Sequence, residues 1–202
     1  MTAQAGSITS VSDPARRQLR RELRAKRRAL PDSIRAHADR AIQTHVRGLA
    51  AFRRARRVAL FMPFDGEPSL ALLVELARRQ RKRLYVPVLR GMTMTFAELE
   101  PDAALAPNFF GILEPKLGRK IDARRLDLVL TPLVGFDDHG VRLGVGRGYY
   151  DRCFRFLRHR SHWLRPKLLG VAYELQRVPP LVPSSWDVPL WAVATERGVS
   201  RF

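Results

Sequence analysis

The feature that most constrains this chain of 202 residues is a glycine-rich loop between two apolar segments. Residues 129–133, Val-Leu-Thr-Pro-Leu, are typical of a buried strand, and residues 135–140 of the turn after it. The loop follows at residues 142–152, Arg-Leu-Gly-Val-Gly-Arg-Gly-Tyr-Tyr-Asp-Arg, and leads into an apolar helical stretch through Phe154 and Leu157. This order is typical of a phosphate-binding loop at a helix N-terminus.

The loop contains three alternating glycines, Gly144, Gly146 and Gly148. Without side chains, its backbone N–H groups can close on an anion such as a phosphate. The pattern is not a Walker A loop, which ends in Gly-Lys and Ser or Thr, and it is not the G-x-G-x-x-G of dinucleotide-binding folds. Taken alone, alternating glycines fit a tight surface turn equally well. The strand and turn predicted just before the loop favour the phosphate loop.

The neighbouring segments resemble the 5-formyltetrahydrofolate cyclo-ligase family, also called methenyltetrahydrofolate synthetases. The resemblance is carried by Pro-Leu-Val-Gly-Phe-Asp at residues 132–137, Gly140, and Arg-Leu-Gly-x-Gly-x-Gly-Tyr-Tyr-Asp at residues 142–151. Further features, in the family's order, are Arg-Gln-Leu-Arg at residues 17–20, Glu67, Gly-Ile-Leu-Glu-Pro at residues 111–115, Asp187, and Thr-Glu at residues 195–196. The resemblance covers nearly the whole chain.

The resemblance implies an ATP-dependent ligase that cyclises 5-formyltetrahydrofolate to 5,10-methenyltetrahydrofolate and releases ADP and phosphate. In the implied reaction, ATP phosphorylates the formyl oxygen, N10 attacks the activated carbon, and phosphate departs. Such chemistry depends mainly on positioning and on charge stabilisation. The implied cofactors are ATP and Mg²⁺, and the implied substrate is the folate, with or without a polyglutamate tail.

The resemblance also implies an ATP site formed by the first helix and the glycine loop. The implied contacts are Arg16, Arg17, Gln18, Leu19 and Arg20, together with Arg142, Leu143, Gly144, Val145, Gly146, Arg147, Gly148, Tyr149 and Tyr150. Arginine can grip phosphate oxygens bidentately, although many family members have lysine in place of Arg16. We expect Arg147 and Tyr149 to act in catalysis, with Arg147 countering charge that develops on the phosphate.

The implied folate contacts are Met62, Glu67, Phe110 and Tyr149. By the resemblance, Glu67 accepts hydrogen bonds from the ring N–H and amino groups of the reduced pterin. From the residues alone, a loop glutamate is more typical of a charge in the first turn of a helix. Likewise, Phe109 and Phe110 have the composition of a core pair.

Asp151 and Asp187 are the implied Mg²⁺ ligands, because hard oxygen atoms suit that ion. From the residues alone, Asp151 fits a charge at a helix N-terminus and Asp187 fits a loop cap. The chain also departs from the family near Asp187. Trp186 and Trp191 replace the His and Asp that relatives commonly have, which leaves the metal and adenine environment open.

Strand-like and helical segments alternate along the chain. A basic helix begins at Pro14, with Leu19, Leu23 and Leu30 near one face, and a second helix has an apolar stripe from residue 34 to residue 49. Strands are predicted at residues 57–62, 85–89, 93–96, 168–172 and 193–195, and a helix at residues 70–77. We predict a disordered lead-in at residues 1–13 and, over residues 14–202, a single Rossmann-like, three-layer α/β domain with a mostly parallel sheet.

The net charge of +18 raises nucleic-acid binding as a different class of function. The basic residues are spread from Arg16 to Arg201, and no helix-turn-helix, zinc-finger or aromatic RNA-binding motif accompanies them. We therefore expect no specific nucleic-acid partner. A degenerate family member that binds a nucleotide but acts on another compound, or on none, is the other alternative, motivated by Trp186 and Trp191.

Cysteine content and hydropathy favour a soluble protein. Cys153 is the only cysteine, so no intrachain disulfide can form and a reducing compartment is the natural setting. No apolar run reaches the ~18 residues of a membrane span. Residues 1–7 are polar and lack the core of a signal peptide. We expect a cytoplasmic monomer that has no membrane partner.

Overall fold

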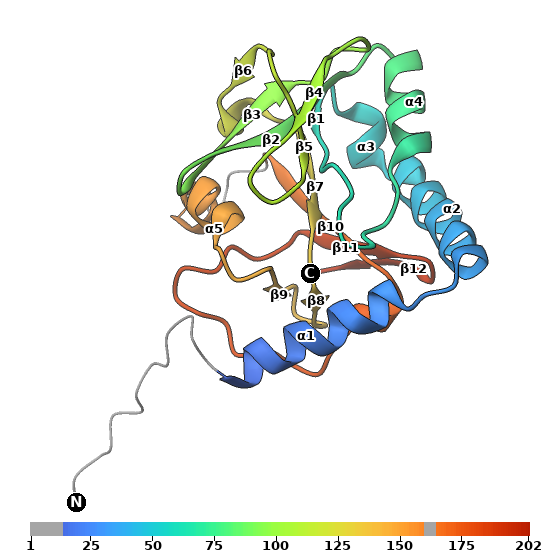
Figure 1. Cartoon of the computed structure of the whole chain (residues 1–202), viewed down its shortest axis with the longest axis vertical. Helices are drawn as coiled ribbons and strands as arrows, with labels where there is room; N and C mark the ends of the chain where they lie inside the picture. Colours follow the sequence, from blue (N-terminus) through green and yellow to red (C-terminus); the bar gives the residue numbers. More distant parts are fainter. Residues whose placement is uncertain (1–13, 160–164) are drawn as a thin grey trace, which may run out of the picture.

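A single eight-stranded sheet organises the computed structural model, which describes residues 14–159 and 165–202 (Figure 1). The disordered lead-in predicted at residues 1–13 lies outside the described residues. The strand order is β12-β11-β10-β7-β1-β2-β3-β6. The strands are β1 Arg57–Ala59, β2 Arg83–Arg90, β3 Thr93–Glu98, β6 Lys120–Ile121, β7 Leu128–Pro132, β10 Lys167–Val171, β11 Ala192–Thr195 and β12 Gly198–Arg201.

The five central strands are parallel, which confirms the mostly parallel sheet predicted from the sequence. The two margins of the sheet are formed by antiparallel pairings, of β12 with β11 at one margin and of β3 with β2 and β6 at the other. Within the parallel part, the chain goes from β1 to β2 on one side and then returns to place β7 on the other side of β1. Open α/β sheets bind ligands at such a switch point, beyond the carboxyl ends of the strands.

Helices cover both faces of the sheet, as the three-layer prediction requires (Figure 1). Helices α2 Asp32–Gly48, α3 Ala50–Arg54 and α4 Ala71–Arg79 lie on one face. Helix α5 Tyr149–Cys153 and the 3₁₀ turn Arg155–His159 lie on the other. Helix α1 Pro14–Arg28 crosses the end of the molecule, next to the short hairpin formed by β8 Gly135–Phe136 and β9 Arg142–Leu143.

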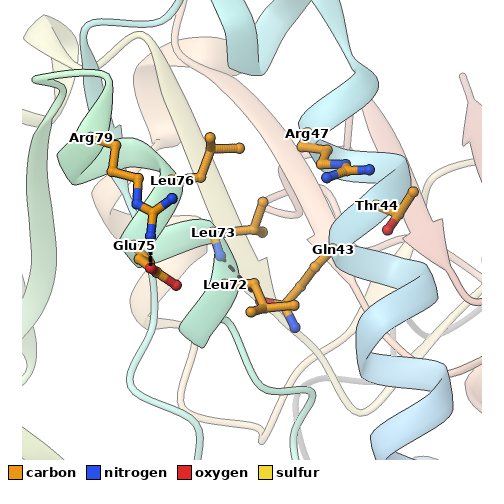
Figure 2. A pocket seen from close by; sticks show the side chains of 8 residues that line it. All are labelled: Gln43, Thr44, Arg47, Leu72, Leu73, Glu75, Leu76 and Arg79. Carbon is orange, nitrogen blue, oxygen red and sulfur yellow. Dashed lines mark hydrogen bonds and ion pairs between the residues drawn. The ribbon is translucent and has the colours of Figure 1, made fainter.

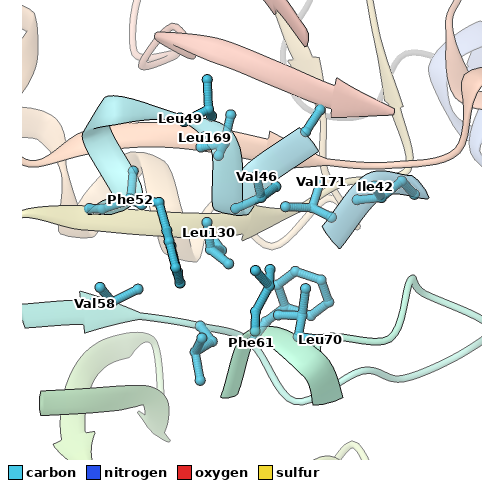
Figure 3. Packing of buried hydrophobic residues seen from close by; sticks show 14 of the residues in the cluster. Ile42, Val46, Leu49, Phe52, Val58, Phe61, Leu70, Leu130, Leu169 and Val171 are labelled. Atoms are coloured by element: carbon cyan, nitrogen blue, oxygen red, sulfur yellow. The ribbon is translucent and has the colours of Figure 1, made fainter. Parts of the chain in front are cut away.

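The larger core lies between the sheet and helices α2 to α4 (Figure 3). Ile42, Val46 and Phe52 are fully buried and face the strands, where Leu130 and Leu169 are equally buried. The burial of Ile42 and Val46 follows from the stripe predicted for the second helix, because residues four apart share one helix face. Ile34 is the exception: it lies in the first turn of α2 and is 55% exposed.

The smaller core lies on the opposite face of the sheet and centres on Phe154. Phe154 packs against Phe96 of β3 with ring centroids 5.8 Å apart, and Tyr150 stacks on Phe154 at 6.2 Å. The glycine loop therefore leads into a helix that is fixed to the sheet by aromatic packing.

Several elements escaped prediction because they are too short for a hydrophobic period to develop. They are α3, β6, β8, β9, β12 and the hairpin of β4 Leu105–Pro107 with β5 Leu113–Pro115. Between β4 and β5, Phe109 is 93% exposed, so the prediction of a core Phe pair is wrong for this residue.

None of the helices within the described residues combines the length and the apolar composition needed to cross a membrane.

We predict that Leu130→Ala lowers the free energy of unfolding by about 2–5 kcal/mol, because it removes a fully buried side chain and leaves a cavity in the larger core. Urea unfolding followed by circular dichroism measures the change. The matched control is Leu117→Ala, whose leucine is 88% exposed and which should change stability by less than about 0.5 kcal/mol. Equal losses in the two variants would contradict the assignment of the core.

Candidate active site

A cavity of about 390 Å³ opens at the switch point of the sheet. Phe61 and Met62, which follow β1, and Pro132 and Leu133, at the end of β7, contribute to its lining. The space exists because β1 ends at Ala59 while β2 continues to residue 90, so the distal part of β2 pairs only with β3. Pro87 lies in this part of β2 and lines the cavity, where its missing N–H group leaves no donor unpaired.

One wall of the cavity is the segment between β4 and β5. Glu114 is buried, and its Oε1 accepts hydrogen bonds from the Leu89 N–H (2.9 Å) and from Asn108 Nδ2 (2.7 Å). The Asn108 Oδ1 in turn accepts the N–H groups of Phe110 (2.9 Å) and Ile112 (3.1 Å). The wall is thus braced by a buried carboxylate. Sequence reasoning included Glu114 in a family motif but gave it no role.

The opposite wall is the glycine loop, which rises from the β8–β9 hairpin. Asp137 is fully buried in the turn of this hairpin and accepts N–H hydrogen bonds from His139 (2.9 Å), Val141 (2.9 Å) and Leu181 (2.8 Å). Gly146 (φ +94°) and Gly148 (φ +62°) adopt left-handed conformations that strain other residues. A rigid hairpin therefore supports a loop whose shape requires glycine.

Contacts from α5 hold the two walls together. The Tyr149 hydroxyl donates to the Gly91 carbonyl oxygen (3.0 Å) in the β2–β3 turn. The Tyr149 ring meets Phe110 edge-on, with centroids 6.4 Å apart, and the Arg147 guanidinium lies 5.7 Å from the centre of the Phe110 ring. Phe110 lies far in the sequence from Arg147 and Tyr149, yet the three side chains meet at the cavity and contribute to its lining.

Arg142 and Asp151 form an ion pair at the base of the glycine loop. Arg142 also donates to the Val188 carbonyl oxygen (2.6 Å), and the Val188 N–H donates to Asp151 Oδ1 (3.2 Å). The Arg142 side chain is only 6% exposed, so much of its charge is matched by protein partners. Both side chains line the cavity.

Helix α1 lies across the two ends of the site. Arg20 Nε donates to the Gly144 carbonyl oxygen (2.9 Å) in the glycine loop. One turn further, Leu23 is buried against Val134 and Leu143, and Gly135 allows the close approach, since a Cβ there would lie 2.8 Å from Leu23. The leucine face predicted for this helix thus docks on the hairpin below the loop.

Arg27 departs from the pattern typical of a basic helix, in which the charged side chains face solvent. Its side chain is 2% exposed and donates to the Leu133 carbonyl oxygen (3.2 Å), the Asp65 carbonyl oxygen (3.1 Å) and Asp65 Oδ2 (3.0 Å). Arg24 Nε adds a 2.6 Å contact to the same carboxylate oxygen. These bonds fasten the loop after β1, in which Asp65 (φ +54°) and Gly66 (φ +76°) take left-handed conformations.

Glu67 lies in this fastened loop and lines the cavity. Its side chain is 12% exposed, its Oε2 accepts the Phe64 N–H (3.2 Å), and its Oε1 lies 3.9 Å from Arg27 Nη1. Burial raises the pKa of Glu67 to about 7, although the charge of Arg27 opposes the shift. A carboxylate so poorly hydrated is suited to accept hydrogen bonds from a ligand.

The cavity brings together many of the residues implied by the resemblance. Those that line it are Met62, Glu67, Phe110, Arg142, Gly144, Val145, Arg147, Gly148, Tyr149, Tyr150 and Asp151. Sequence reasoning missed Arg24, Asn108, Pro87, Leu89 and Met94, which line it as well. No local pattern marks these residues, because strand pairing, the β4–β5 segment and the contact of α1 with the loop at Asp65 bring them to the site.

The other implied residues do not line the cavity. Arg16 donates to the Val182 carbonyl oxygen, Gln18 pairs with Glu22 (2.6 Å), and Arg17 is exposed. Leu19 and Leu143 pack in the apolar contact below the loop, and Gly146 lies beside Arg20. Asp187 accepts the Ser184 N–H (2.8 Å) and so caps a local turn.

The two tryptophans that depart from the family also lie outside the cavity lining. Trp191 is flanked by cations, with Lys167 Nζ 4.2 Å and the Arg201 guanidinium 5.5 Å from the centre of its ring system, and it packs against the larger core. Trp186 is 36% exposed, next to Asp187. The described residues contain no group of three or more His, Cys, Asp and Glu side chains that could hold a metal ion.

A second depression, of about 180 Å³, lies between α2 and α4 (Figure 2). Its polar groups are largely satisfied: Gln43 Oε1 accepts the Leu73 N–H (3.2 Å), and Glu75 pairs with Arg79 (2.5 Å). It contains none of the residues implied by the resemblance. The cavity at the switch point is therefore the candidate active site.

Comparisons with known proteins agree with the motif. The model of the 5-formyltetrahydrofolate cyclo-ligase family matches residues 12–196. The 5-formyltetrahydrofolate cyclo-ligase of Haemophilus influenzae is 37% identical over 183 residues, which cover 88% of this chain and 96% of that protein. The enzyme of the same name from Escherichia coli K12 is 35% identical over 178 residues, covering 86% and 96%.

Solved structures show the same fold. The NMR structure of Aquifex aeolicus 5,10-methenyltetrahydrofolate synthetase matches with a TM-score of 0.79 at 30% identity and covers 92% of both chains. The 5,10-methenyltetrahydrofolate synthetase of Mycoplasma pneumoniae, at 24% identity, matches with a TM-score of 0.72 and covers 90% of this chain and 98% of that one.

We predict that Arg27→Met lowers the free energy of unfolding by about 3–5 kcal/mol, because it removes a buried cation that bonds to the Asp65 carboxylate and to the carbonyl oxygens of Asp65 and Leu133. Arg28→Met is the matched control: Arg28 also pairs with Asp65 but is 56% exposed, so its loss should cost less than about 1 kcal/mol. Urea unfolding of the two variants gives the comparison. Equal costs would show that burial of Arg27 does not matter.

We predict that Glu67→Gln stabilises the protein in a pH-dependent way. Burial raises the pKa of Glu67 in the folded protein to about 7, from an ordinary value of 4.5. At a pH between these two values, the folded chain therefore holds a proton that the unfolded chain has released. Stability of the natural protein therefore falls as pH rises through this window. The variant should be more stable by about 3 kcal/mol at pH 8 and by less than about 1 kcal/mol at pH 5.

Urea unfolding at the two pH values tests this prediction, with Glu75→Gln as the control. Glu75 is 57% exposed on α4, so its replacement should not give a stability difference that grows with pH. A difference between Glu67→Gln and the natural protein that stays constant from pH 5 to pH 8 would contradict the burial argument.

Proposed function

The chain belongs to the 5-formyltetrahydrofolate cyclo-ligase family, and on that premise we propose that its cavity cyclises 5-formyltetrahydrofolate to 5,10-methenyltetrahydrofolate with ATP. The products released are ADP and phosphate. The observation that carries the proposal is the meeting of a buried carboxylate, Glu67, with a glycine loop at one cavity. The carboxylate suits the hydrogen-bond donors of a pterin, and the loop suits a phosphate chain.

The proposed chemistry explains why both ligands must share one cavity. The carbon of a formamide is a poor electrophile, and its oxygen is a poor leaving group. Transfer of the γ-phosphate of ATP to the formyl oxygen releases ADP and solves both problems. N10 then attacks the carbon, loses its proton, and expels phosphate. The protein's task is to hold the formyl oxygen in line with the γ-phosphate.

At the folate end, we assign Glu67 to the ring N–H and amino groups of the pterin. Met62 and Phe110 supply apolar surface, and Tyr149 contributes a ring wall, since its hydroxyl already bonds to Gly91. The fastened loop supports the assignment of Glu67, because Arg24 and Arg27 hold the adjacent Asp65 in place before any ligand arrives. A pre-formed acceptor lowers the entropic cost of binding.

At the ATP end, we assign the phosphates to the glycine loop. The loop residues proposed as contacts are Arg142, Leu143, Gly144, Val145, Gly146, Arg147, Gly148, Tyr149 and, through its backbone only, Tyr150. Arg147 is an exposed cation among the glycines of the loop, and it is the group we assign to the charge of the transferred phosphoryl. Arg20 is joined to Gly144, so residues 16–20 of α1 adjoin the loop and complete the proposed ATP contacts.

We propose that Mg²⁺ binds with the phosphates of ATP and takes Asp151 as a protein ligand. Asp151 lines the cavity, and both of its hydrogen bonds described above go to Oδ1, which leaves Oδ2 for another partner. A site with one or two carboxylates and substrate phosphates is usual for Mg²⁺. Asp187 is the second proposed ligand: it adjoins Val188, which contacts both Arg142 and Asp151. The ion would neutralise phosphate charge.

We also propose a cytoplasmic monomer that accepts polyglutamylated as well as simple folate. The single cysteine suits a reducing compartment, and the excess of positive charge suits a carboxylate-rich tail. The two alternatives are not favoured. Trp191 packs against the core, outside the cavity lining, which removes one of the two reasons to suspect a degenerate member.

The first experiment follows the methenyl product by its near-ultraviolet absorbance after 5-formyltetrahydrofolate and Mg-ATP are mixed with the protein. Product should form only with ATP. We predict that Gly146→Ala lowers turnover at least tenfold and also lowers stability, because its φ of +94° strains any side chain.

Gly144→Ala separates ligand contact from folding. A Cβ at residue 144 meets nothing within 4 Å, so the thermal midpoint of unfolding should not change. If phosphates pack against the loop, the KM for ATP should nevertheless rise, with the KM for the folate unchanged. A wild-type protein that binds ATP but gives no product would overturn the substrate assignment.

A further inference from the structure

The Tyr150 hydroxyl is the one buried side-chain polar atom without a hydrogen-bond partner among residues 14–159 and 165–202. Buried hydroxyl groups are almost always hydrogen-bonded, because a phenol removed from water without a partner destabilises the fold. The neighbouring tyrosine, Tyr149, does bond through its hydroxyl, to the Gly91 carbonyl oxygen. An orphaned hydroxyl in the active site therefore calls for a ligand.

The surroundings of Tyr150 restrict which ligand that is. Tyr150 lines the cavity together with Glu67, and the Glu67 charge acts on the phenol. Its ring stacks on the fully buried Phe154 at 6.2 Å, which packs the side chain against the smaller core. Burial raises the pKa of Tyr150, so the hydroxyl keeps its proton at neutral pH and can donate it.

A phosphate is a poor partner at this point, because its oxygen atoms would meet the charge of Glu67, while the other nearby charge, Arg142, is already paired with Asp151. A flat ring with N–H groups beside a carbonyl fits better. The N–H groups can bond to the Glu67 carboxylate, while the adjacent carbonyl oxygen accepts from the phenol. The 4-oxo face of a pterin has this arrangement of a ring N–H next to a carbonyl.

We propose that the Tyr150 hydroxyl binds the folate and not ATP, by donating a hydrogen bond to the 4-oxo group of the pterin beside the N–H groups that Glu67 accepts. This inference rests on the proposed function and deepens it, because it makes Tyr150 a determinant of substrate specificity. The orphaned hydroxyl is then a binding group held ready, whose cost to the fold is recovered when the 4-oxo pterin binds.

The test is Tyr150→Phe, which removes only the hydroxyl oxygen. We expect the thermal midpoint of unfolding to stay the same or rise, because an unpartnered buried polar group is lost. The Kd for 5-formyltetrahydrofolate, measured by calorimetry, should rise about 3- to 10-fold, as expected for one neutral hydrogen bond. The Kd for ATP should not change.

Tyr173→Phe is the matched control. Tyr173 is also a buried tyrosine, but its hydroxyl donates to Asp39 Oδ1 (2.7 Å), and it packs in the larger core outside the cavity lining. Its replacement should lower the thermal midpoint and leave both dissociation constants unchanged. If Tyr150 binds a ligand and Tyr173 stabilises the fold, Tyr150→Phe changes the Kd for the folate, and Tyr173→Phe lowers the thermal midpoint of unfolding.

Competitive inhibition by folate and by its 4-amino analogue identifies the atom that is recognised. The 4-amino compound offers a donor where folate offers the carbonyl. Tyr150→Phe should therefore weaken the binding of folate 3- to 10-fold, which corresponds to one hydrogen bond of roughly 1 kcal/mol. It should not weaken the binding of the analogue. Unchanged folate affinity, or loss of ATP affinity instead, would overturn the proposal. Absence of wild-type folate binding and turnover would overturn the proposed function itself.

Discussion

The burial of Arg27 is the constraint on which both ends of the site depend. A guanidinium that is 2% exposed must keep its partners, and those partners are Asp65, on the loop after β1, and the carbonyl oxygen of Leu133, beyond β7. The same helix touches the glycine loop through Arg20 and the hairpin below it through Leu23. One helix thus sets the position of the carboxylate wall and of the phosphate wall together, before either ligand is bound.

Charge is distributed unevenly between the cavity and the rest of the surface. Three arginines line the cavity, Arg24, Arg142 and Arg147, and three carboxylates accompany them, Glu67, Glu114 and Asp151. The lining is therefore balanced, while the chain as a whole carries +18. The surplus lies on the remaining surface, where it raises the local concentration of anionic ligands over a range of about 10 Å at moderate salt but does not dictate where they bind.

The sequence predicts what depends on local pattern and misses what depends on distant partners. Strands β1, β7 and β10 are apolar runs, and the glycine loop is a contiguous motif, so both could be located in advance. Arg27 could not, because an arginine in a basic helix is typical of a solvated side chain, although its place four residues after Leu23 puts it on the leucine face. The loop at Asp65 supplies the partners that allow its burial. Glu114 and Asp137 escape for the same reason: each is defined by the N–H groups that converge on it.

Cys153 closes helix α5, next to the residues that stack on the sheet. Burial raises the pKa of its thiol to about 11, so the reactive thiolate is scarce at neutral pH and the group is chemically quiet. Because Cys153 is also only partly exposed, its alkylation should be slow in the folded protein and faster when the helix separates from the core. Tyr149 and Tyr150 belong to the same helix, so the rate of Cys153 alkylation reports how often the helix side of the active site opens. Ligands that stabilise the docked helix should lower this rate.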